Sequence, residues 1–225
     1  MLKRTEKYLL LEQLPSLRQL ILDVYEEMGD KLDIKFEPLP IHPEDLTKWT
    51  LKKMLSENAF KLVILNWDFP FTVNTDFKTA KELLLHMDRE YPIAKKIIIF
   101  PHTTLFKITQ LNGIVSIQGI LEAMDCDAET LRSAAQEVTD DSSFWSQTFT
   151  NLILKFLHRG DLLDQNDYLI LNELSKGTKL NKLPNKLFIS RTSIQRRRIK
   201  MKEFFKVEGL PDTELVKRAK QERYI

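Results

Sequence analysis

The chain has 225 residues, of which 43% are hydrophobic and 29% charged, so it can form two small soluble domains with apolar cores. It has no apolar run long enough to span a bilayer, and the run after its basic N-terminus is too short for a signal peptide. Its single cysteine, Cys126, excludes an internal disulfide and gives no metal-ligand pair, and the four histidines are scattered singly. We therefore expect a cytoplasmic protein without a metal or cofactor.

Apolar runs and amphipathic segments alternate over the first 145 residues. Short apolar runs predict strands, whereas apolar residues at helical spacing, such as Leu17, Leu20 and Val24, predict helices. Residues 103–124 fit either a helix followed by a strand near 119–124 or a hairpin that turns at Asn112-Gly113, and we favour the first arrangement. The other expected strands lie at 8–11, 32–36, 61–65 and 96–100, and the other helices begin at Pro15 or span 44–57, 75–91 and 127–145.

This alternation predicts an α/β fold, namely a doubly wound, five-stranded parallel sheet with helices on both faces. Functional side chains in such sheets lie at the carboxyl ends of the strands. The residues at those places are Glu12, Gln13, Asn66 and Phe100.

The layout of residues 7–140 resembles the flavodoxin-like receiver domain of bacterial response regulators. That family places an acidic pair, then a proline and an arginine, after its first strand, and this chain has Glu12-Gln13-Leu14-Pro15-Ser16-Leu17-Arg18. The family's phosphoryl-accepting aspartate, four residues before a proline, corresponds to Asn66, and its hydroxyl residue after the fourth strand corresponds to Phe100. The family's lysine after the fifth strand has no counterpart in residues 119–124.

These departures predict a degenerate receiver that is not switched by aspartyl phosphorylation. An acyl phosphate needs a carboxylate nucleophile and Mg²⁺, and this pocket offers Glu12 beside the neutral Gln13 and Asn66. Phe100 adds bulk where the family's hydroxyl would contact phosphate. Two alternatives stay open: Asp68 could replace Asn66 as the phosphate acceptor, and Glu12 could be an ordinary loop carboxylate.

The two ends of the chain carry opposite charge. From Lys176 to the end there are 15 basic and 5 acidic residues, a net charge of +10, whereas the preceding residues have 19 basic and 27 acidic, a net charge of −8. This asymmetry predicts an acidic domain at 1–145 joined to a nucleic-acid-binding domain at 163–225 by a partly helical linker at 146–162. The apolar stripe of Phe149, Leu152, Ile153 and Phe156 fits either a core or an interface.

The C-terminal domain resembles the LuxR/NarL-type helix-turn-helix domain along its full length. Residues 163–167 fit the opening cap, Gly177 a helix stop, and 182–187 the scaffold helix, provided that Pro184 lies in its first turn. Phe188-Ile189-Ser190 matches the turn of that family, and Ser190 can cap the recognition helix that follows. The start of a fourth helix is matched by 210–216.

A helical wheel at about 100° per residue separates the faces of the recognition helix. Ile194, Met201 and Phe205 form its packing face, with Arg198 beside it. The resemblance implies that the opposite face enters the major groove of DNA, with Gln195, Arg196 and Ile199 at base edges. The candidate DNA-binding residues, including the phosphate contacts expected of the other cations, are Arg191, Thr192, Ser193, Gln195, Arg196, Arg197, Ile199 and Lys200.

The sequence therefore predicts a non-enzymatic, sequence-specific transcription regulator that binds double-stranded DNA as a homodimer. The candidate sources of its input signal are a histidine kinase, a small molecule or another protein, and no membrane association is expected. Two alternatives remain: a response regulator phosphorylated at a non-standard position such as Asp68, and a protein-interaction module whose basic helix binds an acidic partner.

Overall fold

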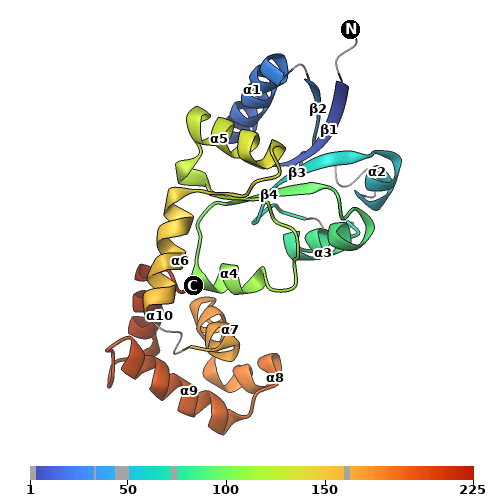
Figure 1. Ribbon diagram of the computed structural model, residues 1–225. Coiled ribbons are helices and arrows are strands. Elements are labelled where there is room, and N and C mark those ends of the chain that lie inside the picture. The colour runs from blue at the N-terminus through green and yellow to red at the C-terminus, as the bar shows by residue number, and fades with distance from the viewer. Residues whose placement is uncertain (1–3, 33, 44–50, 72–74, 160–162) are drawn as a thin grey trace. The chain divides into compact units, whose positions relative to one another are not determined.

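The computed structural model describes residues 4–32, 34–43, 51–71, 75–159 and 163–225 (Figure 1). The chain divides into two compact units, the first comprising 1–102 and 113–151 and the second comprising 103–112 and 152–225. Among the described residues, no helix combines the length and hydrophobicity that crossing a bilayer requires.

The first unit is built on a fully parallel sheet with strand order β2-β1-β3-β4-β5-β6. Helices α1 and α5 lie on one side of the sheet and α3 on the other (Figure 1), so the predicted doubly wound α/β fold is confirmed. The strands are β1 (Arg4–Leu11), β2 (Ile34–Pro40), β3 (Phe60–Asn66), β4 (Lys95–Phe100), β5 (Gly119–Glu122) and β6 (Phe144–Trp145). The helices are α1 (Pro15–Leu32), α2 (Leu51–Glu57), α3 (Ala80–Glu90) and α5 (Ala128–Thr139).

Burial on both faces explains the uninterrupted apolar runs 62–65 in β3 and 97–100 in β4. In β3, Leu62 to Leu65 are all buried, and in β4, Ile97 to Phe100 are buried. The helices bury one apolar stripe each, as Ile21 and Val24 of α1 and Leu131 of α5 do in a shared core with β1, β3 and β4. The carboxyl ends of β1 and β3, which pair directly, are thereby brought to the same edge of the sheet.

The sheet has one strand more than the sequence predicted. We expected a helix from 127 to 145, but α5 ends at Thr139 and Phe144–Trp145 pairs with Gly119 and Ile120 of β5 as a short sixth strand. Asp141 adopts a left-handed conformation with φ of 61°, which a helix cannot continue through. The run Asp140 to Ser143 favours such a turn, because short polar side chains satisfy the local backbone outside a helix.

Several predicted boundaries were also wrong by a few residues. The second strand begins at Ile34 because Leu32 still belongs to α1. The third helix begins at Ala80 rather than 75, since Thr79 caps it by accepting a hydrogen bond from the Glu82 N–H. Of the helix expected at 44–57, the part 44–50 lies outside the described residues. The favoured arrangement of 103–124 is confirmed, with α4 (Leu105–Gln110) followed by β5.

The second unit consists of helices around one apolar core. Leu171, Leu183, Ile194, Met201 and Leu215 are fully or almost fully buried in it. Leu152 and Phe156 pack in the same core, so these members of the apolar stripe serve packing. The helices are α6 (Gln147–Arg159), which begins in the first unit, α7 (Gln165–Ser175), α8 (Leu183–Leu187), α9 (Arg191–Phe204) and α10 (Asp212–Gln221).

Helix α4 belongs to the second unit although the sequence places it between two strands of the first. The backbone N–H groups of Leu105 and Phe106 donate to the carbonyl oxygens of Arg223 (2.8 Å) and Tyr224 (2.9 Å). Leu105 is also buried in the core of this unit. The end of the chain therefore satisfies backbone donors in the first turn of α4, which have no partners within that helix.

Candidate nucleic-acid interface and receiver-like pocket

The second unit opens with a helix whose cap is complete. The carboxylate of Asp164 accepts hydrogen bonds from the N–H groups of Asn166 (2.8 Å) and Asp167 (3.1 Å), and the carboxylate of Asp167 accepts from the Asp164 N–H (3.0 Å). This reciprocal pair is a capping box, which satisfies donors at the start of α7. The opening cap predicted at 163–167 is confirmed.

A short turn joins α8 to α9. Pro184 lies in the first turn of α8, where its missing N–H removes no helical hydrogen bond. Phe188 ends α8 in the left-handed region, with φ of 57°. Ser190 then caps α9 by accepting a hydrogen bond from the Ser193 N–H at 3.2 Å. The predicted turn and cap of the basic helix are therefore confirmed.

The two faces of α9 are those that the helical wheel predicts. Ile194 and Met201 are buried, and Phe205, which follows the helix, is buried with them. Ser193 and Gln195 are half-buried at the margin of the exposed face. That face consists of Thr192, Arg196, Ile199, Lys200 and Glu203, and Arg191 in the first turn of the helix is exposed as well.

The cations of α9 differ in their partners. Within the described residues, its ion pairs are formed by Arg197, Arg198, Lys200 and Lys202. Arg191 and Arg196 stand among the exposed residues of the helix. Exposed cations on a helix can contact phosphate oxygens or guanine edges.

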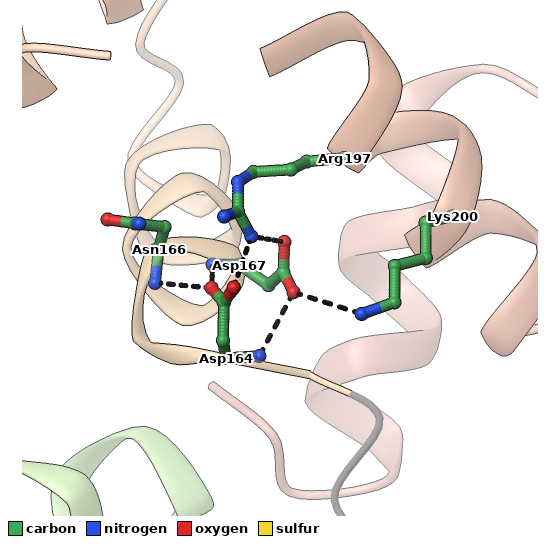
Figure 2. Close-up of polar contacts among 5 residues, drawn as sticks. All are labelled: Asp164, Asn166, Asp167, Arg197 and Lys200. Carbon is green, nitrogen blue, oxygen red and sulfur yellow. Dashed lines mark hydrogen bonds and ion pairs between the residues drawn. The ribbon is translucent and has the colours of Figure 1, made fainter. Parts of the chain in front are cut away.

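Arg197 is held by the capping carboxylates of α7 (Figure 2). Its Nη1 donates to Asp164 Oδ2 at 2.6 Å and to Asp167 Oδ1 at 2.8 Å, and Lys200 Nζ lies 3.8 Å from Asp167 Oδ2. The side chain of Asp167 is 0% exposed and that of Arg197 is 19% exposed. We call Asp164, Asp167, Arg197 and Lys200 the α7–α9 charge cluster.

The pKa values of Asp164 and Arg197 in the cluster are both shifted in the direction that favours the charged form. Burial raises the pKa of Asp164, but hydrogen bonds from Arg197 and from the Asp167 N–H outweigh it and leave the pKa below its usual value. The hydrogen bonds to Asp164 and Asp167 raise the pKa of Arg197. The cluster therefore joins the start of α7 to the middle of α9 by charge-assisted hydrogen bonds. The phosphate contact predicted for Arg197 stays a prediction.

Arg198 makes a second connection, to α10. Its Nη2 donates to Asp212 Oδ1 at 2.7 Å, and Lys202 Nζ lies 3.0 Å from the same oxygen. Its Nη1 donates to the side-chain oxygen of Gln195 at 2.5 Å. The guanidinium is thus turned toward the start of α10, and it orients the amide of a residue predicted to read a base.

The receiver-like pocket holds a buried acid–amide pair. Glu12 follows β1 and Asn66 ends β3, and both are 0% exposed. Asn66 Nδ2 donates to both carboxylate oxygens of Glu12, at 2.9 and 3.0 Å, while the Leu14 N–H donates to Glu12 Oε1 at 2.9 Å. Asn66 Oδ1 accepts from the Asp68 N–H at 2.9 Å. The two predicted pocket residues are therefore in direct contact, with Gln13 half-buried next to Glu12.

Aromatic rings fill the end of β4. Phe100 is fully buried, with its ring centroid 5.2 Å from that of Trp67 and 6.4 Å from the parallel ring of Phe149. The Phe100 ring is thus packed inside the first unit. Trp67 and Phe149 were not among the predicted pocket residues, because their contact depends on the positions of β3 and α6.

The carboxyl group of Glu12 has a shifted pKa. Burial raises the pKa of Glu12, although hydrogen bonds from Leu14 and Asn66 oppose the rise. Arg18 Nη1 donates to the backbone oxygen of Glu12 at 3.3 Å and lies 2.9 Å from His42 Nδ1. No group of three or more His, Cys, Asp or Glu side chains among the described residues is arranged to hold a metal ion.

Comparison with known proteins gives a structural likeness. No protein-family model and no curated protein sequence matches the chain. Solved structures of the response regulator RcsB do match it over almost its whole length, and one from Salmonella typhimurium shares 14% identity and a TM-score of 0.58, covering 96% of this chain and 99% of its own. The chain shares their fold.

Two further RcsB structures contain DNA. One, of two RcsB dimers bound to two parallel DNAs, has a TM-score of 0.63 at 14% identity and covers 96% of this chain and 98% of its own. The other, from Salmonella enterica serovar Typhimurium, is bound to a promoter with the phosphomimetic BeF₃⁻, and has a TM-score of 0.60 at 15% identity over 95% and 97% of the two chains.

The α7–α9 charge cluster predicts a stability effect. Arg197→Met leaves the Asp167 carboxylate buried without its closest cation, and loss of one member of a buried pair costs roughly 3 kcal/mol. We expect urea unfolding of the full chain to show this loss in the transition of the second unit. Arg196→Met removes an equal charge from an exposed neighbour and should change the free energy of unfolding by less than about 0.5 kcal/mol. Equal midpoints for the two variants would contradict the role of the cluster.

The buried Glu12 predicts a pH-dependent stability. Because its pKa is raised in the folded chain, its contribution to stability is full below the ordinary value of 4.5 and is lost as the pH rises through the raised value. Relative to the native chain, Glu12→Gln should gain melting temperature as the pH increases from about 4 to about 8. Glu57→Gln, at an exposed site of α2, is the control and should show no such trend. A constant difference for Glu12→Gln across this range would refute the interpretation.

Proposed function

We propose that the chain is a sequence-specific, DNA-binding transcription regulator of the response-regulator type. The observation that carries the proposal is the exposed cationic face of α9, a capped helix held by charged hydrogen bonds to α7. A polyanion offsets the repulsion among these cations, and duplex DNA presents phosphates at the required density. The fold of relatives solved on DNA supports the same function.

The proposal assigns separate roles to the residues of α9. Arg196 and Gln195 would hydrogen-bond to base edges, and Ile199 would contact a thymine methyl group. Arg191 and Lys200 would contact phosphates, with Thr192 on the exposed face and Ser193 at its margin. Arg197 would chiefly position α9, because its guanidinium is occupied by two carboxylates. The receiver-like domain would span 1–145, the linker 146–162 and the DNA-binding domain 163–225.

We further propose that aspartyl phosphorylation does not switch the receiver-like domain. Asn66 takes the place of the acceptor, and its amide donates to both oxygens of the buried Glu12 carboxylate. Phe100 is packed between aromatic rings at the place of the hydroxyl. Input would then come from the abundance of the protein, a partner protein or a small molecule that favours one of two arrangements.

Homodimerisation is part of the proposal. A single recognition helix reads few base pairs, and two-fold dimers double the length of the site. An RcsB structure that resembles this chain contains dimers on DNA.

Two alternatives remain to be separated. In the first, Asp68 accepts phosphate; it is exposed beyond the end of β3, and its N–H is bound by Asn66. In the second, the basic helix binds an acidic protein, which would explain the charge but not a sequence preference among DNA duplexes.

Sequence selection tests DNA recognition. The full chain should enrich a defined motif from a random pool of duplexes at about 150 mM salt. Arg196→Ala should weaken binding to the best duplex by roughly 1–3 kcal/mol and relax the motif at one position. Arg89→Ala removes the same charge from an exposed site on α3 and should change neither quantity. A pool that shows no enrichment would favour the acidic-partner alternative.

A phosphate analogue tests the switching claim. Affinity for the enriched duplex should be unchanged by beryllofluoride with Mg²⁺, because the pocket lacks an acceptor carboxylate and pairs its acid with Asn66. Asn66→Asp alone should not create a response, since Phe100 still occupies the place of the hydroxyl. A tenfold tightening in the native chain that Asp68→Ala abolishes would instead identify Asp68 as the acceptor.

A further inference from the structure

Phe188 is unusual in two ways: a large apolar side chain is exposed to solvent, and its backbone adopts a left-handed conformation. Its side chain is 94% exposed, and no large apolar residue in the described part of the chain is more exposed. Its backbone lies in the left-handed region, with φ of 57° and ψ of 38°, which is strained for a bulky residue and favours glycine or asparagine. Folding therefore gains nothing from a phenyl ring at this position.

The surroundings of Phe188 separate its ring from the core. Leu187 and Ile189, its two neighbours, pack against the core of the second unit, whereas Phe188 projects from the turn between α8 and α9. Two residues later, Ser190 caps α9, and the exposed Arg191 follows it. The ring thus stands at the amino-terminal end of the cationic surface, where the positive end of the helix dipole adds to the positive charge.

We infer that Phe188 is a DNA-contacting residue whose ring packs on the apolar surface of the duplex beside the recognition helix. The inference rests on the proposed function and extends it to a residue outside α9. Charge complementarity selects duplex DNA as the occupant, because an anionic polymer bound along α9 would pass the turn that carries the ring. The apolar groups that a duplex offers there are deoxyribose carbons and thymine methyl groups. The contact explains why the strained aromatic residue is kept in an otherwise regular turn.

An apolar contact has a signature that a cationic one lacks. Loss of a phosphate contact weakens binding and lowers the slope of log affinity against log salt by about one ion. Loss of the Phe188 ring should weaken binding with the slope unchanged. It should also leave folding intact, since asparagine tolerates the left-handed conformation and a polar group suits an exposed site.

The test uses the full chain and a duplex enriched from a random pool by the native chain. Phe188→Asn should lower affinity on the order of tenfold at every salt concentration, with an unchanged slope and an equal or higher melting temperature. Phe188→Leu keeps an apolar side chain and should lose only part of the affinity. Val115→Asn, at an 88% exposed site of the first unit, is the matched control and should bind as the native chain does.

The outcomes separate this inference from the proposed function. Native affinity for Phe188→Asn would overturn the contact while leaving DNA binding in place. A melting temperature several degrees lower for Phe188→Asn would also overturn it, because the ring would then be structural. Absence of salt-dependent binding by the native chain would refute the proposed function itself. Replacing thymine by uracil in the duplex identifies the group that Phe188 contacts. A loss of affinity that is larger in the native chain than in Phe188→Asn indicates the methyl group, and an equal loss in both chains indicates deoxyribose.

Discussion

The geometry of the basic helix depends on one buried carboxylate. Asp167 completes the cap of α7 through the Asp164 N–H and accepts a hydrogen bond from Arg197 in the middle of α9. A fully buried carboxylate is costly unless it is paired and hydrogen-bonded, so the folded second unit requires α9 to present Arg197 at this point. This contact fixes the rotation of α9 about its own axis, so that Arg196 and Ile199 point away from the core. The cap of one helix therefore defines the exposed surface of another.

The receiver-like pocket also contains a buried carboxylate, that of Glu12, but its side-chain partner is an amide and not a cation. Burial raises the pKa of Glu12, and the hydrogen bonds of its amide partner Asn66 oppose the rise. The hydrogen bonds from Asn66 occupy both of its oxygens, and the stacked rings of Phe100 and Phe149 fill the adjacent strand end. A site that binds phosphate and a divalent cation needs open oxygens and several negative charges. At this edge of the sheet Glu12, Asn66 and Phe100 are all fully buried.

Local signals in the sequence predicted most of the helices and strands. Contacts between residues that are far apart in the sequence could not be predicted from it. The caps at Asp164 and Ser190, the stop at Gly177 and the buried face of Ile194 and Met201 depend on neighbours within a few residues, and all are confirmed. The sixth strand was missed because two residues have no periodicity and pair only with β5. The hydrogen bonds of Arg197 in the α7–α9 charge cluster were missed because its partners Asp164 and Asp167 lie some thirty residues earlier in the chain. In the pocket, spacing located Glu12 and Asn66, but their contact required the pairing of β1 with β3.

If α9 is the recognition helix, DNA covers one face of the second unit, and a lysine footprint tests this directly. Acetylation of the full chain with and without the enriched duplex, read by mass spectrometry, compares Lys200 on α9 with Lys217 on α10, whose side chains are 51% and 63% exposed. We predict that DNA protects Lys200 and leaves Lys217 reactive. Equal reactivity of Lys200 in both samples, or protection of Lys217 in its place, would contradict the claim that α9 is the recognition helix.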